Sequence, residues 1–206
     1  MISCYYNIKR LIRVSVGSLD EDMLELKRQL VHLINGSAIT AAVFVLKPVI
    51  GLLVLAPLLV ALVLLFFAPR LWPDLRIANH LMYHFERRKD IVEFPFRGAI
   101  FYGLGIIAPI VLLDRNHGCA VILVLSVGDA FSNLVGRRYG RVRIGHRSIE
   151  GSAGFFVTSW AAASLLVSPS HAFVLAFTGA VIELFGVWDD NLSIPLGLSI
   201  LAKFFL

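Results

Sequence analysis

The polar segment from Gly128 to Ser152 contains the residues of this chain that are best suited to chemistry. It reads GDAFSNLVGRRYGRVRIGHRSIEGS, begins inside one apolar run and ends at the start of the next. A carboxylate inside an apolar run, such as Asp129, is costly in lipid unless a cation meets it. Glycines let backbone N–H groups approach an anion, and arginine guanidinium groups match phosphate oxygens in pairs. The segment therefore predicts a site for a phosphate-bearing ligand.

Glycines and arginines are interleaved in the second half of this segment. They are Gly136, Arg137, Arg138, Gly140, Arg141, Arg143, Gly145, Arg147 and Gly151. A basic loop that rests on anionic lipid headgroups is an alternative interpretation for the outer arginines. That interpretation does not explain Ser148 and Glu150, because a carboxylate among phosphate-binding groups suits a divalent metal that bridges phosphates.

A polar stripe precedes the arginines. Ser126, Asp129, Asn133 and Gly136 are spaced by three, four and three residues, which places them on one face of a helix. A polar stripe inside a membrane span usually faces a cavity. A structural ion pair between Asp129 and an arginine of a neighbouring loop is the alternative.

Polar residues also stand at the start of the first apolar run. Arg28 and His32 are four residues apart and therefore lie on one side of a helix. Lys27 and Arg28 either snorkel to lipid headgroups or bind a ligand. His32 is either a hydrogen-bonded packing residue or a catalytic group.

Acidic residues near the C-terminus complete the set. Glu183 lies in an apolar run and is followed by Asp189 and Asp190, which form either a solvated turn or a route for a metal or a proton. Phosphoryl transfer needs cations for the phosphate charge, carboxylates for Mg²⁺ and a group that positions the hydroxyl nucleophile. The four polar groups together predict this chemistry.

The composition predicts an integral membrane protein. The 206 residues are 58% hydrophobic with a mean hydropathy of +0.80. Apolar runs predict about seven transmembrane helices in one all-α domain over 1–206. They lie at 29–46, 48–67, 98–113, 118–134, 152–168, 171–187 and 192–206. The net charge of +5 does not predict nucleic-acid binding, because the basic residues lie in the connections between apolar runs.

The distribution of basic residues predicts the topology. Sixteen of the nineteen Lys and Arg residues lie in the arm 1–28 or in the loops 68–97 and 135–151. The turns at 47–48, 114–118 and 168–170 carry few charges. The positive-inside rule therefore places the arm and both loops in the cytoplasm. We expect a multi-pass protein of the cell membrane in a prokaryote, or of the endoplasmic reticulum in a eukaryote, with its active face in the cytoplasm.

Two helices are expected next to the spans. Ser18-Leu-Asp-Glu21 resembles a capping box and predicts a helix that continues into the first span. The segment 69–92 predicts an interfacial amphipathic helix, with a solvated cytoplasmic helix as the alternative. Its apolar face would contain Leu71, Leu75, Ala78, Met82 and Phe85.

In this order, the motifs resemble those of the CTP-dependent lipid kinases, the family of dolichol kinase, phytol kinase and CTP-dependent diacylglycerol kinase. The resemblance extends from about Glu25 to Pro195. It consists of Glu25-x-Lys-Arg28-x3-His32, Glu93-Phe-Pro-Phe-Arg-Gly98-Ala, Gly128-Asp-Ala130-x5-Gly136-Arg-x2-Gly140, Ser148-x-Glu150-Gly-Ser152 and Asp189-Asp-Asn-Leu-x-Ile-Pro195. It implies that the γ-phosphate of CTP is transferred to the hydroxyl of a polyprenol, a phytol-like isoprenoid or a diacylglycerol-type lipid, with Mg²⁺ or another divalent cation.

The resemblance also assigns residues. Lys27, Arg28, Asp129 and Gly136 correspond to nucleotide-binding positions, and Arg147 stands where the family usually has lysine. The complete nucleotide-binding prediction is Lys27, Arg28, Asp129, Gly136, Arg137, Gly140, Arg147 and Ser148. The predicted catalytic residues are Asp129, Glu150 and His32, and the predicted metal ligands are Asp129, Glu150, Asp189 and Asp190.

Three other functions fit parts of the pattern. A cytidylyltransferase that makes a CDP-lipid needs similar arginines and metal ligands. A small transporter would use Asp129 and Glu183 as a proton or cation path. A non-catalytic membrane scaffold would leave the buried acids unexplained. The expected partners are the membrane, CTP and a lipid alcohol, and the sequence predicts no protein partner.

Overall fold

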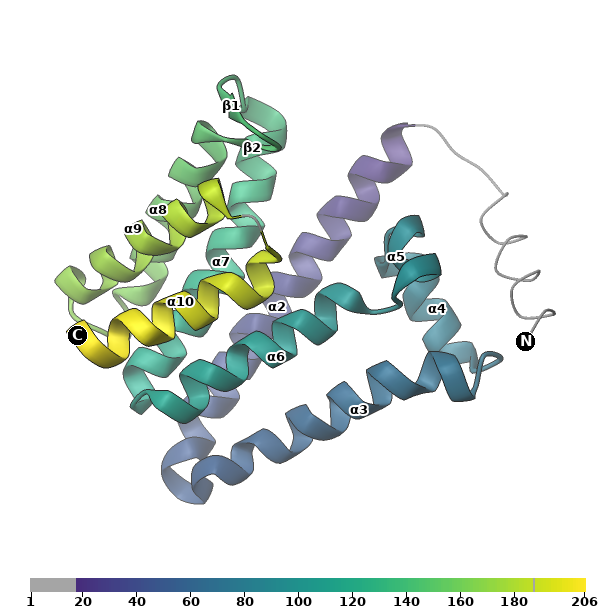
Figure 1. The fold of residues 1–206 in the computed structure, drawn as a ribbon, viewed down its shortest axis with the longest axis horizontal. Coiled ribbons are helices and arrows are strands. Elements are labelled where there is room, and N and C mark those ends of the chain that lie inside the picture. Colours follow the sequence, from purple (N-terminus) through teal and green to yellow (C-terminus); the bar gives the residue numbers. More distant parts are fainter. Residues whose placement is uncertain (1–17, 187) are drawn as a thin grey trace.

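A central helix, α7 (Arg115–Tyr139), organises the fold (Figure 1). The structure is a computed structural model that describes residues 18–186 and 188–206. The remaining helices are α2 (Ser18–Ile50), η1 (Gly51–Val54), α3 (Leu55–Leu71), α4 (Arg76–Phe85), α5 (Arg88–Glu93), α6 (Arg97–Leu112), α8 (Ile149–Ala163), α9 (Pro169–Phe185) and α10 (Asp190–Phe205). Helices α2, α6, α8, α9 and α10 pack against α7, whereas α3 packs on α6. A hairpin of β1 (Arg143–Ile144) and β2 (Arg147–Ser148) joins α7 to α8. The prediction of an all-α chain is confirmed apart from this hairpin.

Six of the seven apolar runs lie mainly in one long helix each, whereas the run 48–67 is divided among α2, η1 and α3. Two helical stretches are long and apolar enough to cross a membrane, namely Met23–Leu71, which comprises α2, η1 and α3, and Arg115–Tyr139. The other apolar helices are shorter; α6 and α9, for example, have 16 and 17 residues. The structure therefore bears out the helices, and the seven membrane spans stay a prediction.

The turn between the first two runs lies later than predicted. We expected it at Lys47 and Pro48, but α2 continues through Pro48 to Ile50. The chain turns at Gly51, which has a φ of 59°. Glycine adopts this left-handed conformation without a steric penalty, whereas a proline near a helix end can bend the helix without ending it. The glycine, rather than the proline, decides where the helix stops.

The loop predicted over 135–151 is shorter in the structure. The central helix continues to Tyr139, and α8 already begins at Ile149. The hairpin between them turns at Gly145, which has a φ of 62°. About half of the predicted loop, 135–139 and 149–151, therefore belongs to the ends of α7 and α8, and the hairpin contains most of the rest.

The predicted helix over 69–92 is interrupted. It forms the end of α3, then α4 and α5, because Trp72 precedes Pro73 and the residue before a proline is forced out of the helical region. Ala78 and Met82 are buried, whereas Ile77 is 70% exposed. The amphipathic character is thus present in α4 alone.

The start of α2 agrees with the sequence. The helix begins at Ser18 and runs without a break into the first apolar run, as the capping box predicted. The side chains of that box and the arm before it lie outside the described residues.

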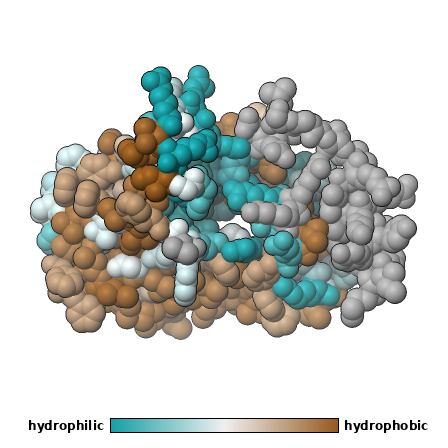
Figure 2. All heavy atoms as spheres, turned by 45° about the horizontal axis from the view of Figure 1, so that its top comes forward, coloured by the Kyte–Doolittle hydropathy of each residue, from teal (hydrophilic) through white to brown (hydrophobic). Residues whose placement is uncertain are grey.

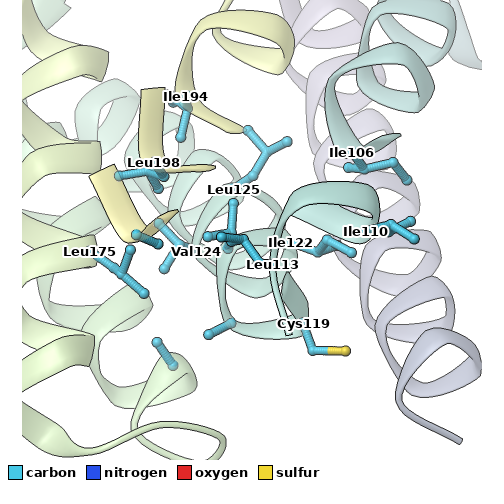
Figure 3. Packing of buried hydrophobic residues seen from close by; sticks show 14 of the residues in the cluster. Ile106, Ile110, Leu113, Cys119, Ile122, Val124, Leu125, Leu175, Ile194 and Leu198 are labelled. Atoms are coloured by element: carbon cyan, nitrogen blue, oxygen red, sulfur yellow. The ribbon is translucent and has the colours of Figure 1, made fainter. Parts of the chain in front are cut away.

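The apolar core lies where α6, α7, α9 and α10 meet. Ile122 and Leu125 of α7 are completely buried there, together with Ile106, Leu175 and Leu198 from the three neighbouring helices (Figure 3). Between membrane helices, close packing of this kind stabilises the contact, because lipid chains are as apolar as these side chains. The core fixes the helices whose ends carry the polar residues.

Close contact between α6 and α10 depends on a glycine. A Cβ added at Gly105 would lie 2.0 Å from the backbone oxygen of Asn191, in the first turn of α10. A larger residue at this position would push the two helices apart. Gly105 therefore sets the position of the acidic residues at which α10 begins.

The two ends of the bundle differ in character. One end contains the hairpin, the starts of α2, α6 and α10 and most of the charged residues. The view that brings the hairpin end forward shows hydrophilic side chains gathered beside a hydrophobic flank (Figure 2). Exposed apolar residues cover much of α3, including Leu59, Val60, Val63, Leu64 and Phe67. The polar chemistry is thus concentrated at one end of an otherwise apolar surface.

Candidate functional site

A polar pocket of about 90 Å³ lies between the end of α7, the hairpin and α9. Its lining residues are Ser132, Asn133, Gly136, Arg137, Arg143, His146, Arg147, Ser148 and Glu183. The nucleotide residues predicted in this part of the chain are therefore largely brought together: Gly136, Arg137, Arg147 and Ser148 share one pocket.

Arg147 connects three elements around the pocket. It lies in β2, its Nη1 atom is 3.2 Å from Oε1 of Glu183 in α9, and its Nη2 atom contacts the carboxylate of Asp190 in α10. Two carboxylates thus offset the charge of one guanidinium. The sequence predicted a role in nucleotide binding, and the structure adds that this side chain is already fixed by two acids.

Glu183 is the most deeply buried acid among the described residues, with 1% of its surface exposed. Ser132 donates a hydrogen bond of 2.6 Å to its Oε1 atom, and Ser152 donates to its Oε2 atom. A buried carboxylate is tolerated only when a cation and hydrogen-bond donors compensate for its lost hydration. Here Arg147 and the two serines satisfy both oxygens.

The two serines were not predicted as site residues. Ser132 lies three residues after Asp129, and Ser152 closes the Ser148-Ile-Glu-Gly-Ser motif. The signal available in the sequence was their position near the polar ends of apolar runs. Their shared partner, Glu183, becomes visible only when α7, α8 and α9 are packed together.

Glycines allow the hairpin to lie against α7. A Cβ added at Gly136 or Gly140 would lie 3.0 Å or 2.8 Å, respectively, from Oγ of Ser148. Ser148 itself caps α8 by accepting a hydrogen bond of 3.1 Å from the backbone of Gly151. Close packing explains Gly140, which does not line the pocket, whereas Gly136 is part of the lining.

Glu150 has a different environment from the one predicted. Its two carboxylate oxygens both accept from the backbone N–H of Val142, at 3.3 Å. Hydrogen bonds from its own backbone N–H and from those of Arg141 and Val142 lower the pKa of the Glu150 carboxyl, although desolvation opposes them. Glu150 does not line the pocket, and it stabilises the hairpin that forms one wall.

Asp129 lies beside the pocket and connects to it through Asn133. The amide of Asn133, a lining residue, donates to Oδ1 of Asp129 at 3.1 Å. His32 packs edge-on against Tyr102, and its Nε2 atom is buried without a hydrogen-bond partner. The structure thus places a second polar group, between α2, α6 and α7, next to the arginine pocket.

Lys27 and Arg28 approach the site from α2. Arg28 Nη1 is 3.0 Å from Oε2 of Glu25, and a Cβ added at Gly98 would lie 3.7 Å from its Nη2 atom. Arg28 therefore reaches the start of α6, where Arg97 lies 3.7 Å from Asp189. Lys27 is exposed, and neither basic residue of α2 lines the pocket.

A buried charge cluster supports this end of α2, and the sequence did not indicate it. Arg87, between α4 and α5, lies 3.0 Å from Oε2 of Glu25, which also accepts from Gln29 through Oε1 at 2.8 Å. Glu86 and Asp90 are buried nearby, at 8% and 7% exposure. The interaction joins segments 62 residues apart, so no local spacing could have predicted it.

The four acids predicted as metal ligands have other partners. Asp189 caps α10 by accepting from Asn191 and lies near Arg97, while Asp190 contacts Arg147. Within residues 18–186 and 188–206, no group of three or more His, Cys, Asp or Glu side chains is arranged to hold a metal ion. The acids therefore do not fit a preformed Mg²⁺ centre, and the assignment of ligands stays a prediction.

Comparison with known proteins gives distant relatives. No protein-family model and no solved structure matches the chain. An uncharacterized protein of Methanocaldococcus jannaschii is 28% identical over 182 residues, which cover 84% of this chain and 90% of that protein. CTP-dependent diacylglycerol kinase 1 of Schizosaccharomyces pombe is 28% identical over 147 residues, covering 60% of this chain and 66% of the kinase.

A probable chloroplastic phytol kinase of Zea mays is 25% identical over 169 residues, covering 71% of this chain and 54% of the kinase. The chain thus matches between half and two thirds of the length of these two named kinases. The matches confirm the resemblance found in the motifs: the chain is a distant homologue of the CTP-dependent lipid kinases.

Proposed function

We propose that this protein is a CTP-dependent lipid kinase, which transfers the γ-phosphate of CTP to the hydroxyl of a membrane lipid alcohol. The observation that carries this proposal is the position of the arginine pocket beside Asp129, because Asn133 lines the pocket and donates to the Asp129 carboxylate. The pocket suits phosphates and the carboxylate suits a hydroxyl group. The names of the related kinases supply the nucleotide and the class of acceptor.

The pocket is the proposed site of the triphosphate. Arg137, Arg143 and Arg147 line it, and guanidinium groups bind phosphate oxygens through paired N–H donors. Ser148 adds a hydroxyl group at the start of α8. Lys27 and Arg28 are proposed to contribute from α2, beside the start of α6.

Asp129 is the proposed acceptor of the proton from the lipid hydroxyl. The hydroxyl oxygen forms a bond to the γ-phosphorus, the bond between that phosphorus and the β,γ-bridging oxygen breaks, and CDP leaves. The proton passes to the carboxylate of Asp129, and Asn133 holds that carboxylate in place. The unpartnered Nε2 atom of His32 is suited to orient the hydroxyl.

Divalent metal is a separate part of the proposal. Lipid kinases need positive charge to offset the transferring phosphoryl group. The acids predicted to bind Mg²⁺ are not grouped around one point in the structure. We therefore assign no step of the reaction to a metal. Addition of EDTA to the kinase assay, followed by Mg²⁺, tests the requirement directly.

The function is tested by product analysis. Purified protein is incubated with CTP or ATP labelled in the γ-phosphate and with polyprenol, phytol or diacylglycerol, and the lipids are separated by thin-layer chromatography. We expect a labelled lipid phosphate and CDP. Absence of labelled lipid with every alcohol contradicts the proposal. Release of labelled pyrophosphate from CTP when a lipid phosphate replaces the alcohol, with formation of a CDP-lipid, identifies a cytidylyltransferase instead.

A transporter fits the structure less well. A proton path through Glu183 needs a carboxyl group that gains and loses its proton during transport. Both oxygens of Glu183 accept hydrogen bonds from serines, and Arg147 lies beside it. Protein groups therefore occupy both oxygens of Glu183, and neither oxygen is left open to a transported ion.

A further inference from the structure

Glu183 is a buried charge that the proposed reaction does not use. It lies at the end of α9 and extends to the wall of the arginine pocket. Its partners come from three other elements: Ser132 of α7, Ser152 of α8 and Arg147 of β2. A carboxylate with this many partners has one orientation, and that orientation determines where Arg147 lies.

Arg147 is restrained at both ends of its guanidinium group. Nη1 is 3.2 Å from Glu183 and Nη2 contacts Asp190. Its Nε atom is buried and has no hydrogen-bond partner. An unpaired buried N–H group is costly, and an oxygen of a bound anion would satisfy it.

We infer that Glu183 is a positioning residue for the nucleotide, because it holds Arg147 so that the Nε–H edge remains available to a phosphate oxygen. The inference rests on the proposed function. Without Glu183, the guanidinium would keep only Asp190 as a charged partner and could turn away from the pocket. The residue acts through Arg147, and Ser132 and Ser152 act through Glu183.

A preorganised guanidinium binds an anion more tightly because its side-chain freedom is lost during folding rather than during binding. A purely structural ion pair would show a different result: its loss would lower stability and leave nucleotide affinity unchanged in the protein that remains folded. Affinity for CTP and thermal stability therefore have to be measured on the same samples.

The decisive experiment is a double-mutant cycle with the full chain in detergent. The dissociation constant for labelled CTP is measured by equilibrium binding for wild type, Glu183→Gln, Arg147→Gln and the double variant. We expect Glu183→Gln to weaken CTP binding about tenfold, as for a lost hydrogen bond to a charged group. In the Arg147→Gln background, Glu183→Gln should change the dissociation constant for CTP by less than about twofold. Equal effects in both backgrounds, or none in the wild type, overturn the inference.

A matched pair of serines gives a milder test. Ser152→Ala removes a hydroxyl that donates to Glu183, whereas Ser159→Ala removes a buried hydroxyl of the same helix that donates to the Phe155 carbonyl. We expect CTP binding to weaken about threefold for Ser152→Ala and to stay unchanged for Ser159→Ala. Equal CTP affinities of the two serine variants contradict the inference. This test remains available if Glu183→Gln does not fold.

The outcomes separate the inference from the proposed function. If wild-type protein binds CTP and phosphorylates a lipid but the cycle shows no coupling, only the role of Glu183 is wrong. If wild-type protein does not bind CTP, the proposed function fails and the role of Glu183 fails with it.

Discussion

Asp129 carries the chemical step of the proposed reaction, because its carboxylate lies beside the arginine pocket and Asn133 holds it there. The Asn133 amide donates both to the carboxylate and to the backbone oxygen of Asp129, at 3.1 Å and 2.9 Å. This four-residue spacing was visible in the sequence as a polar stripe. His32 of α2 interacts electrostatically with Asp129, and this proximity follows from the packing of α2 on α7.

Replacement of Asp129 tests its role as the proton acceptor. We expect Asp129→Asn to lower kcat by about 100-fold or more, because loss of a general base has effects of this size. CTP binding and the thermal unfolding temperature should change little, since asparagine has the same shape. Asp74→Asn, in the exposed turn before α4, is the control and should retain full activity. Full activity of Asp129→Asn would show that another group takes the proton.

Glu86 makes the stability of the protein depend on pH. Burial raises the pKa of its carboxyl to about 7, the charge of Asp90 contributes to the rise, and Arg28 and Arg87 oppose it. The folded state therefore binds more protons than the unfolded state between about pH 4.5 and pH 7. The contribution of Glu86 to stability is therefore greatest below this window and falls as the pH rises through it.

Glu86→Gln should abolish this fall, because glutamine cannot ionise. We expect the variant to exceed wild type in stability at pH 8 by about 1–3 kcal/mol and to match it near pH 4.5. Thermal unfolding in detergent at the two pH values measures the difference. Glu93→Gln, at an exposed position of α5, is the control. An unchanged pH dependence in Glu86→Gln would show that Glu86 is already ionised in the folded protein.

The ion pairs of individual residues could not be predicted from the sequence. The sequence showed that Arg147, Glu183 and Asp190 are present and are polar residues near apolar runs. It did not show that one guanidinium contacts both acids, because these residues approach each other only after α9 and α10 have packed on α7. Glu25 and Arg87 are a second example, since they are joined across the α4–α5 segment.

Helices, in contrast to ion pairs, follow from local apolar patterns. Continuous apolar runs need backbone hydrogen bonds within the segment. Six of the seven runs lie mainly in one helix each, and the run 48–67 is divided among α2, η1 and α3. The exact ends were less predictable. Pro48 remained inside α2, whereas Pro73 followed a helix end, and the difference depends on the residues next to each proline and on packing.

Contact between α6 and α10 gives a test at the scale of elements. Gly105→Ala would place a methyl group 2.0 Å from the Asn191 backbone oxygen, so the first turn of α10 must shift. We expect a loss of stability of about 1–3 kcal/mol, as in overpacked cores. CTP-dependent activity should also fall, since Asp189 and Asp190 begin the displaced helix.

Gly98→Ala is the matched control in the same helix. A Cβ there meets only Arg28, at an ordinary contact distance of 3.7 Å. Alanine also favours a helix over glycine by up to about 1 kcal/mol, so this variant should be neutral or slightly more stable. Thermal unfolding measures the stability of Gly105→Ala and Gly98→Ala. Equal stabilities would show that α6 and α10 are not in close contact.

At the scale of the whole molecule, the bundle separates a charged end from an end with few charges. The hairpin, with the pocket, lies at one end, and a hydrogen-bonded series of Asp114, His117 and His171 joins α7 to α9 at the other. The distance between the His117 Nε2 and His171 Nδ1 atoms is 3.1 Å. The charge distribution in the sequence predicts this asymmetry, because long basic loops and short turns with few charges alternate along the chain. It did not indicate the hydrogen-bonded series.

Labelling of single cysteines tests whether the two ends lie on opposite sides of the membrane. In a chain with Cys4→Ala and Cys119→Ala, Arg143→Cys places a thiol on the exposed hairpin, and Ser170→Cys places one in the exposed first turn of α9. Expressed in bacterial cells, Ser170→Cys should react with a membrane-impermeant maleimide from outside, whereas Arg143→Cys should react only after the cells are permeabilised. Reaction of both positions from the same side would contradict the predicted topology, because an even number of spans would then lie between them. Labelling of Arg143→Cys alone from outside would instead show an inverted protein, whose pocket could not draw on cytoplasmic nucleotide.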